Sequence, residues 1–405
     1  INLSTHTSMN KPLQTIDTHS VMFITPRPEV VMVEGKGSWL TDNNGKRYLD
    51  FLQGWAVNCL GHGNPGMIEA LNAQAKKLIN PSPAFYNDPM IGLSNLLTEN
   101  SCFNKVFFAN SGAEANEGAI KLARKWGQLN KSGAFEIITF DHRFHGRTLA
   151  TMSASGKPGW DTMFAPQVPG FPKADLNDLD SVKKLVTDKT VAVMLEPVQG
   201  EGGVIPTTKE FMQSLRKFTK ENNILLIVDE VQAGCGRTGK LFAYQHYGIE
   251  PDIMTLGKGI GGGVPLSALM ATDAVACFVP GDQGGTYNGN PLMTAVGISV
   301  IEQLLAPGFL ESVRSKGELL SKELLSISAE FNLDGERGEG LLRALMLSSD
   351  IGSKLVELAR DRGPEGLLIN SPRPNLLRFM PALNVSEDEI RQMCNILREL
   401  LKQVG

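Results

Sequence analysis

Residues 252–265, DIMTLGKGIGGGVP, join a short apolar strand to a run of glycines that ends at a proline. The glycines satisfy G-x-G-x-x-G, the fingerprint of dinucleotide-binding loops, which requires a helix directly afterwards. Pro265 and the apolar run 266–270 predict another strand there instead. A Walker A loop is excluded as well, because Gly259 stands where that motif has serine or threonine. The stretch therefore places one lysine, Lys258, just past a strand end.

Lys258 can approach a bound group closely because its neighbours are glycines. Its amine attacks a carbonyl only when neutral, so burial or a neighbouring positive charge has to lower its pKa. An ordinary surface lysine in a loop is the alternative, and the lysine taken alone favours it. Residues elsewhere in the chain decide between the two interpretations.

Asp229 ends the apolar strand 224–228 and begins the sequence DEVQ. Open α/β sheets bind ligands beyond the carboxyl ends of their strands. A carboxylate at that edge can keep the ring nitrogen of a cofactor protonated. Gln232 is then placed to reach an oxygen on the ring, and Val231 to pack on its face. A helix N-cap is the alternative role for Asp229.

A second predicted strand ends at the sequence NSGAE, residues 110–114. Ser111 and Glu114 form the S-x-x-E pattern of a capping box. The same turn can also seat a phosphate, because free amides at a helix N-terminus attract anions and Gly112 permits close approach. We expect Ser111, Gly112 and Ala113 to bind an anion, with the capping box as the alternative or additional role.

Phe144 and Arg147 follow a third predicted strand, residues 136–140. An aromatic ring there can stack on a cofactor ring, and an arginine suits bidentate binding of a carboxylate. Core packing for Phe144 and simple solvation for Arg147 are the alternatives.

Strands and helices alternate from residue 105 onward, and the strands are apolar and rich in β-branched residues. This pattern predicts an α/β fold with a mostly parallel central sheet flanked by helices. After residue 292, long helical stretches with short strands indicate a smaller α+β domain. We expect an N-terminal segment that packs with the small domain, a large domain and a C-terminal small domain, at residues 1–64, 65–292 and 293–405.

The composition is that of an ordinary globular protein, with 405 residues, 42% apolar and 20% charged. The net charge of -4 gives no reason to expect a nucleic-acid partner or an anionic membrane. No apolar run approaches the roughly 18 residues of a membrane-spanning helix. The five cysteines form no C-x-x-C pair, which argues against a metal site or a disulfide framework and favours the reducing cytoplasm.

Together these motifs resemble the class III aminotransferases, which share the fold-type I architecture of pyridoxal-phosphate enzymes, over nearly the whole chain. The resemblance rests on the segments NSGAEAN (110–116), VDEVQ (228–232), TLGKG (255–259) and GTYNGNP (285–291). It implies pyridoxal 5'-phosphate held by Lys258 as a Schiff base, with Asp229 on the ring nitrogen. It also implies a homodimer in which Thr286 reaches the cofactor phosphate of the neighbouring subunit.

The same resemblance implies small-molecule partners, an amino acid and a 2-oxo acid. Arg147 would hold the α-carboxylate of the amino donor, and Arg378 that of 2-oxoglutarate or glutamate. Glu201 would act as a gate that pairs with Arg378 when the donated amino group lies at the far end of the substrate. It would move aside for glutamate.

Two segments, Gln53–Trp55 and Tyr287–Asn288, depart from the residues usual in the family, and both are candidates for the substrate entrance. They leave the exact acyl group of the donor open, but not the chemistry. Ornithine, N-succinylornithine and 4-aminobutyrate are the alternative donors, with the same chemistry and a different pocket. A mutase or decarboxylase on the same scaffold is disfavoured, because Arg147 and Arg378 imply two carboxylate-bearing partners.

Overall fold

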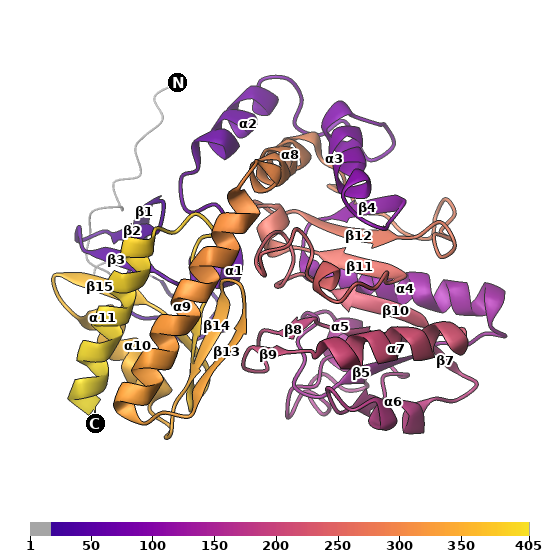
Figure 1. The fold of residues 1–405 in the computed structure, drawn as a ribbon. Coiled ribbons are helices and arrows are strands. Elements are labelled where there is room, and N and C mark those ends of the chain that lie inside the picture. Colours follow the sequence, from indigo (N-terminus) through magenta and orange to yellow (C-terminus); the bar gives the residue numbers. More distant parts are fainter. Residues whose placement is uncertain (1–17, 405) are drawn as a thin grey trace.

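The computed structural model describes residues 18–404 and has a larger and a smaller part (Figure 1). The larger part is built on a seven-stranded sheet, and the smaller part contains two four-stranded sheets. Residues 1–17 of the predicted N-terminal segment and residue 405 lie outside the described residues.

The seven-stranded sheet has the strand order β4-β12-β11-β10-β7-β5-β6. β10 runs parallel to β7 and β11, and β5 runs parallel to β7 and β6. β12 runs antiparallel to both of its neighbours, β11 and β4. The prediction of a mostly parallel sheet is confirmed. The strands are β4 (Lys105–Ala109), β5 (Glu136–Phe140), β6 (Lys173–Ala174), β7 (Thr190–Leu195), β10 (Leu225–Asp229), β11 (Ile253–Leu256) and β12 (Ser267–Ala271).

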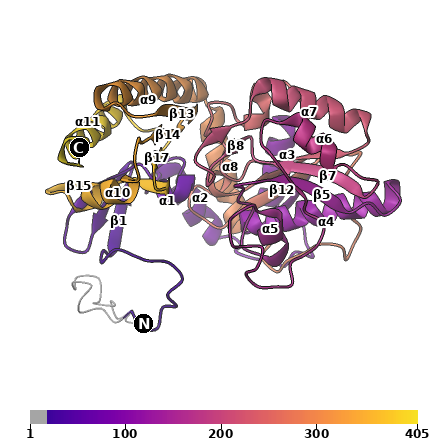
Figure 2. The same cartoon turned by 90° about the horizontal axis from the view of Figure 1, so that it is seen from below.

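Helices cover both faces of this sheet, with α4 (Gly112–Asn130) on one face and α7 (Lys209–Glu221) on the other (Figure 2). Successive side chains of a strand point to opposite faces. In β10, Ile227 therefore packs into the apolar cluster under α4, whereas Leu226 and Val228 pack into the cluster that includes α7. The same alternation turns Asp229, two residues after Ile227, toward α4. The unbroken apolar strand is explained by this burial on both sides.

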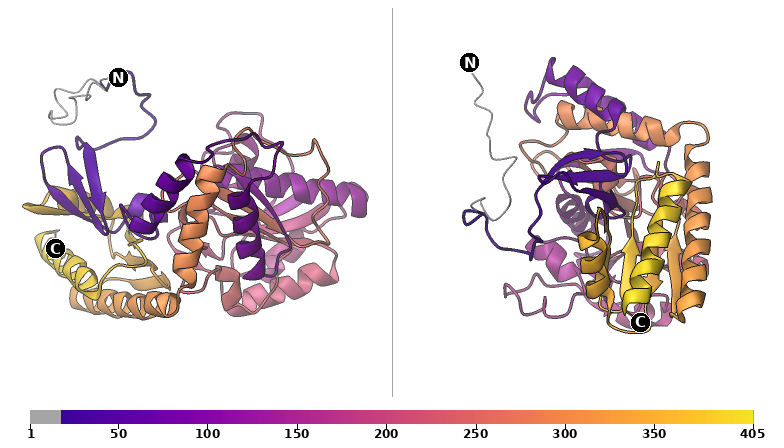
Figure 3. Two further views of the ribbon diagram at one scale, coloured as in Figure 1. Left: turned by 90° about the horizontal axis from the view of Figure 1, so that it is seen from above. Right: turned by 90° about the vertical axis from the view of Figure 1, so that its left-hand side faces the viewer.

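Helices α2 (Pro65–Ala75) and α8 (Pro291–Leu305) each begin with an Asn-Pro pair. The side chain of Asn64 accepts from the Met67 amide, and that of Asn290 accepts from two amides of α8. The proline follows at a position whose amide hydrogen needs no partner. Both helices pack together, and α8 also contacts α3 (Asp88–Glu99) and α9 (Phe309–Phe331), so α8 connects the two parts (Figure 3).

The smaller part joins both ends of the chain. The N-terminal strands β1 (Met32–Lys36), β2 (Trp39–Asp42) and β3 (Arg47–Asp50) form one sheet with β15 (Glu365–Leu368), which pairs with β3 in parallel. The second sheet has the order β13-β14-β17-β16. Its strands and the packed helices are β13 (Gly335–Glu339), β14 (Leu342–Met346), β16 (Asn370–Arg373), β17 (Leu376–Phe379), α9 (Phe309–Phe331), α10 (Gly352–Asp361) and α11 (Glu387–Val404). The domain boundaries at residues 64 and 292 stay predictions.

Several short elements lacked a sequence pattern strong enough to predict them. The remaining short elements are α1 (Gln53–Ala56), α5 (Leu149–Ala154), α6 (Leu179–Leu185), β8 (Val198–Gln199), β9 (Ile205–Pro206) and the 3-10 turns η3 (Ala243–His246) and η4 (Lys258–Ile260). Within residues 18–404, no single helix has the length and apolar composition needed to cross a membrane. Helices α8 and α9 have the required length and apolar composition only when they are taken together, and a bend of 71° separates them.

Candidate active site

A cavity of about 260 Å³ opens at the carboxyl ends of the central parallel strands. It is lined by the start of α4 and by the loops that follow β5, β7, β10 and β11. The lining residues are Gly112, Ala113, Asn116, Phe144, His145, Gly146, Arg147, Glu196, Glu201, Asp229, Val231, Gln232 and Lys258. This set brings together the residues predicted from sequence except Ser111, Thr286 and Arg378, which do not line the cavity.

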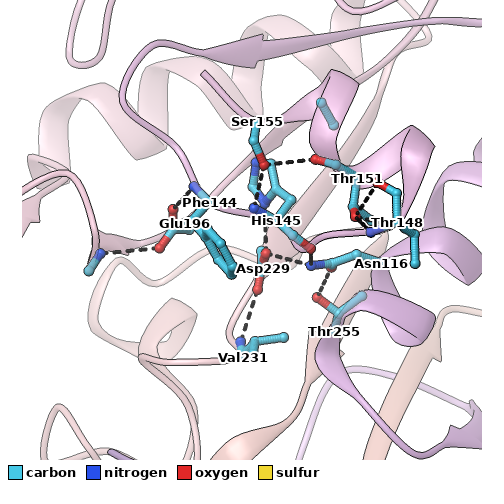
Figure 4. Close-up of polar contacts among 12 residues, drawn as sticks. Asn116, Phe144, His145, Thr148, Thr151, Ser155, Glu196, Asp229, Val231 and Thr255 are labelled. Atoms are coloured by element: carbon cyan, nitrogen blue, oxygen red, sulfur yellow. Dashed lines mark hydrogen bonds and ion pairs between the residues drawn. The ribbon is translucent and has the colours of Figure 1, made fainter. Parts of the chain in front are cut away.

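Asp229 is held by three donors and is almost fully buried (Figure 4). Its Oδ2 accepts from Asn116 Nδ2 at 2.8 Å and lies 2.7 Å from His145 Nδ1. Its Oδ1 accepts from the Val231 amide at 3.0 Å. Turns, not a helix, follow the strand, so the alternative role as a helix N-cap does not apply. The carboxylate has about four lone-pair positions, so one stays available toward the cavity.

The sequence interpretation missed Asn116 and His145 as partners of Asp229. Asn116 Nδ2 also donates to the His145 carbonyl at 2.7 Å, and its Oδ1 accepts from Thr255 Oγ1 at 2.6 Å (Figure 4). Asn116 stands four residues after Gly112 in α4, and that helical spacing puts both on one face. This spacing is the sequence signal from which Asn116 could have been predicted.

Lys258 opens the short 3-10 turn η4 after β11, and no α-helix lies between β11 and β12. Its φ of 45° lies in the left-handed region, which is uncommon for a residue with a side chain. A Cβ at Gly259 would lie 3.0 Å from Cys235 Cβ, so the glycine lets this turn pack closely. Burial, followed by the positive charge of Arg378, lowers the pKa of Lys258. This is the direction that a reactive amine requires.

The start of α4 carries the predicted capping box, which is confirmed. Ser111 Oγ accepts from the Glu114 amide at 3.3 Å, while Glu114 Oε2 accepts from the Asn110 and Ser111 amides. The amides of Gly112 and Ala113 stay outside this box and border the cavity. A Cβ on Gly112 would lie 2.6 Å from Val231 Cγ1, so only glycine allows α4 to approach the site this closely.

Gln232 has a buried amide group at the cavity. Its Oε1 accepts from Arg378 Nη1 at 3.4 Å, whereas its Nε2 has no hydrogen-bond partner among residues 18–404. A buried donor without a partner costs about 1–3 kcal/mol. The geometry therefore leaves a donor ready for an oxygen of a bound molecule.

Glu196, at the end of β7, is a further residue that the sequence interpretation did not assign. Its Oε1 accepts from the Phe144 amide at 3.2 Å and its Oε2 from the Gly200 amide at 3.1 Å. Burial raises the pKa of Glu196, against the opposing charge of Arg143. This carboxyl group connects the segment that presents the Phe144 ring to the loop that carries Glu201.

Two arginines stand at different depths. Arg147 is exposed at the cavity mouth, with its guanidinium 5.8 Å from the Trp160 ring centre. The Arg378 side chain is 0% exposed, and its Nη2 donates to Glu201 Oε1 at 2.8 Å. The predicted pair of Glu201 and Arg378 is therefore in contact.

Thr286 and the two atypical segments lie away from the cavity lining. Thr286 is exposed, and its carbonyl accepts from Asn80 Nδ2 at 3.4 Å. Gln53 is buried, while Trp55 and Tyr287 are exposed. The expectation that Gln53–Trp55 and Tyr287–Asn288 border the entrance stays a prediction.

A lysine with a lowered pKa and a fixed aspartate lie at one edge of the seven-stranded sheet, and a masked arginine from β17 of the smaller part lies beside them. This combination is typical of an enzyme with the fold-type I architecture. The family description "Aminotransferase class-III" matches residues 24–401. The chain belongs to the class III aminotransferases.

Three similar proteins have names that give a particular aminotransferase activity. The acetylornithine aminotransferase of Ralstonia nicotianae is 75% identical, over 95% of this chain and 98% of that protein. The structure of N-acetylornithine aminotransferase from Stenotrophomonas maltophilia superimposes with a TM-score of 0.81 at 35% identity, covering 94% of this chain and 97% of the other. Ornithine aminotransferase from Toxoplasma gondii, in a structure with partial occupancy of PLP, gives 0.93 at 31% identity, covering 98% and 95%.

The lowered pKa of Lys258 predicts a pH-dependent effect on stability. The folded pKa lies below the unfolded value of about 10.4, so the unfolded chain binds the proton more tightly. The resulting destabilisation of the folded protein is fully present below the folded-state pKa. It is lost as the pH rises to the unfolded-state pKa. Lys258→Met should therefore raise the melting temperature of the cofactor-free protein, relative to wild type, more at pH 7 than at pH 10.

Differential scanning calorimetry at both pH values measures this difference. Lys183→Met, at a half-exposed lysine of α6, is the control and should show no such pH dependence. A gap between wild type and Lys258→Met that is unchanged or larger at pH 10 would contradict the burial of a charged amine.

Proposed function

We propose that the chain catalyses the transamination of N2-acetyl-L-ornithine with 2-oxoglutarate, giving N-acetylglutamate 5-semialdehyde and L-glutamate, with pyridoxal 5'-phosphate as cofactor. This places it in arginine biosynthesis. The observation that carries the proposal is the pair of arginines around Lys258, one open at the mouth and one masked by Glu201. The 75% identity to the Ralstonia protein supports the choice of amino donor. The segments 144–148 and 196–203 resemble that branch of the family as well.

The residues present fit this cofactor. The unpartnered Gln232 Nε2 suits the phenolic oxygen, and the open position of Asp229 suits the ring nitrogen. The amides at Gly112 and Ala113, with Ser111, suit the phosphate, because a helix N-terminus favours an anion. Val231 and Phe144 border the space for the ring. The bound cofactor would supply the electron sink that stabilises a carbanion at the substrate carbon.

The chain's own side chains then position groups and move protons. Asp229 would keep the ring nitrogen protonated, and its three donors fix its orientation. Lys258 would hold the cofactor through its aldehyde carbon at rest. Once displaced by the substrate amine, the neutral Lys258 amine would move the proton from the substrate's amino-bearing carbon to that cofactor carbon, and such proton transfer contributes about 10²–10⁴-fold.

The two arginines support a ping-pong sequence with two kinds of substrate. Arg147 binds the α-carboxylate of the donor, whose reacting amino group lies at the other end of the molecule. Arg378 stays paired with Glu201 during this half-reaction. In the second half-reaction, Arg378 binds the α-carboxylate of 2-oxoglutarate and Glu201 moves aside.

We propose the cytoplasm as the location of the protein. The five cysteines are free thiols, and the reducing cytoplasm would preserve them.

The alternatives keep the chemistry and change the donor, to ornithine, N-succinylornithine, succinyl-diaminopimelate or 4-aminobutyrate. A steady-state comparison of N-acetylornithine, N-succinylornithine, ornithine and 4-aminobutyrate, with 2-oxoglutarate as acceptor, separates them. We expect the highest kcat/KM for N-acetylornithine. A large advantage for ornithine or for 4-aminobutyrate would overturn the assignment of the donor.

Arg147→Ala tests the proposed donor site. Loss of a charge-assisted pair should raise the KM for N-acetylornithine about tenfold or more, while cofactor affinity changes little. Arg47→Ala, which removes an exposed arginine of the smaller part, is the control. Equal losses of donor and cofactor affinity in Arg147→Ala would exclude the role given to Arg147.

We propose a homodimer in which Thr286 binds the partner's cofactor phosphate. Thr286 lies outside its own cavity, on a loop that shares a groove with the exposed apolar residues Tyr86 and Ile91. Exposed apolar surface of this kind marks contact sites.

A hybrid dimer with one Thr286→Ala and one Lys258→Ala subunit tests this sharing. If Thr286 acts across the interface, the site that keeps Lys258 receives the intact threonine and binds cofactor with wild-type affinity. Homodimeric Thr286→Ala should bind it more weakly. Weakened binding at the Lys258-containing site of the hybrid would show that Thr286 acts within its own subunit.

A further inference from the structure

Arg378 is closed to any substrate in this structure. Its side chain is fully buried, and its three guanidinium nitrogens donate to Asn370 Oδ1, Gln232 Oε1 and Glu201 Oε1. A substrate carboxylate therefore reaches Arg378 only after Glu201 has left. Arg378 itself keeps its two amide partners when that happens.

Glu201 has more to lose than Arg378 when the pair separates. Its side chain is 26% exposed, so water solvates it only in part. Burial raises the pKa of Glu201. The charge and the hydrogen bond of Arg378, together with the smaller effect of the Lys157 charge, outweigh burial, so the pKa is lowered overall. The carboxylate is thus ionised, and its separation from Arg378 is unfavourable unless the remaining charge finds another partner.

A second cation already contacts this carboxylate. Lys157 Nζ lies 3.5 Å from Glu201 Oε2, the oxygen that Arg378 does not use. The ammonium of Lys157 also lies 5.1 Å from the Phe144 ring centre and 5.3 Å from the Trp160 ring centre. These two aromatic faces hold the ammonium beside the gate through cation–π attraction.

We propose that Lys157 is the partner that holds the Glu201 carboxylate when the gate is open. This inference rests on the proposed function, because it concerns the half-reaction in which Arg378 binds a substrate carboxylate. Glu201 bridges Arg378 and Lys157 in the closed state and turns toward Lys157 when it opens. The carboxylate therefore has a positively charged partner in both positions of the gate. The difference in free energy between the closed and the open position stays small for this reason.

The principal alternative is that Lys157 binds the donor directly. Lys157 and Arg147 lie near the same ring, that of Trp160, so both are near the mouth of the cavity. A direct contact would affect the donor half-reaction and would not depend on Glu201. A gate partner would affect the glutamate half-reaction and would act only through Glu201.

The test follows each half-reaction separately in the cofactor-loaded enzyme, by stopped-flow absorbance. Lys157→Gln should lower kcat/KM for L-glutamate about tenfold, and change that for N-acetylornithine by less than about twofold. Lys157→Arg, which keeps the charge, should restore the glutamate value. Lys183→Gln, at a half-exposed lysine of α6, is the surface control.

A binding measurement accompanies the kinetics. Glutarate carries two carboxylates and no reacting group, so its dissociation constant, measured by isothermal titration calorimetry, reports gate opening without chemistry. It should rise in Lys157→Gln by a factor similar to the loss with glutamate. An unchanged glutarate constant would contradict the proposal.

A double-mutant comparison decides whether Lys157 acts through Glu201. In a Glu201→Gln background, Lys157→Gln should change the glutamate half-reaction by less than about twofold, because the charge that it serves is absent. A persisting tenfold loss, or equal losses in both half-reactions, would overturn the proposal. If wild-type enzyme does not react with glutamate at all, the proposed function itself fails, and this outcome is separate from the others.

Discussion

The buried carboxylate of Asp229 is the interaction on which the site depends. An ionised group in an apolar sheet is tolerated only when it is hydrogen-bonded, and here the donors come from three different segments. Asn116 belongs to α4, His145 to the loop after β5, and the Val231 amide to the turn after β10. The hydrogen bonds to this one carboxylate therefore fix the relative positions of the start of α4, the loop after β5 and the turn after β10.

The remaining charges of the cavity follow the same rule. Lys258 is placed among glycines, where burial lowers its pKa, and the nearby carboxylates only partly oppose that effect. Arg378 is buried because Glu201 and two amide groups satisfy its guanidinium. Glu196 connects the loop that carries Phe144 to the loop that carries Glu201, because it accepts hydrogen bonds from one backbone amide of each. The cavity thus combines fixed charges beside the sheet with one pair that has to separate during turnover.

The sequence predicted the central sheet and the residues that end its strands, because apolar runs followed by a polar residue or glycine are local patterns. Lys258, Asp229 and Gly112 all belong to such patterns. Asn116 and Lys157 were not predicted in their roles, because their partners lie 113 and 44 residues away in the chain. Arg378 was placed by resemblance, and its complete burial under Glu201 is visible only in the packed structure.

A low pKa alone does not make a lysine reactive, and Lys173 shows why. Burial lowers the pKa of Lys173 to about 7, yet its amine donates to Thr139 and to two carbonyls and does not line the cavity. Borohydride reduction of the purified, cofactor-loaded protein, followed by peptide mass mapping, tests the central claim most directly. We predict a phosphopyridoxyl group on Lys258 and none on Lys173. A label on Lys173, or no labelled lysine, would contradict the role given to Lys258.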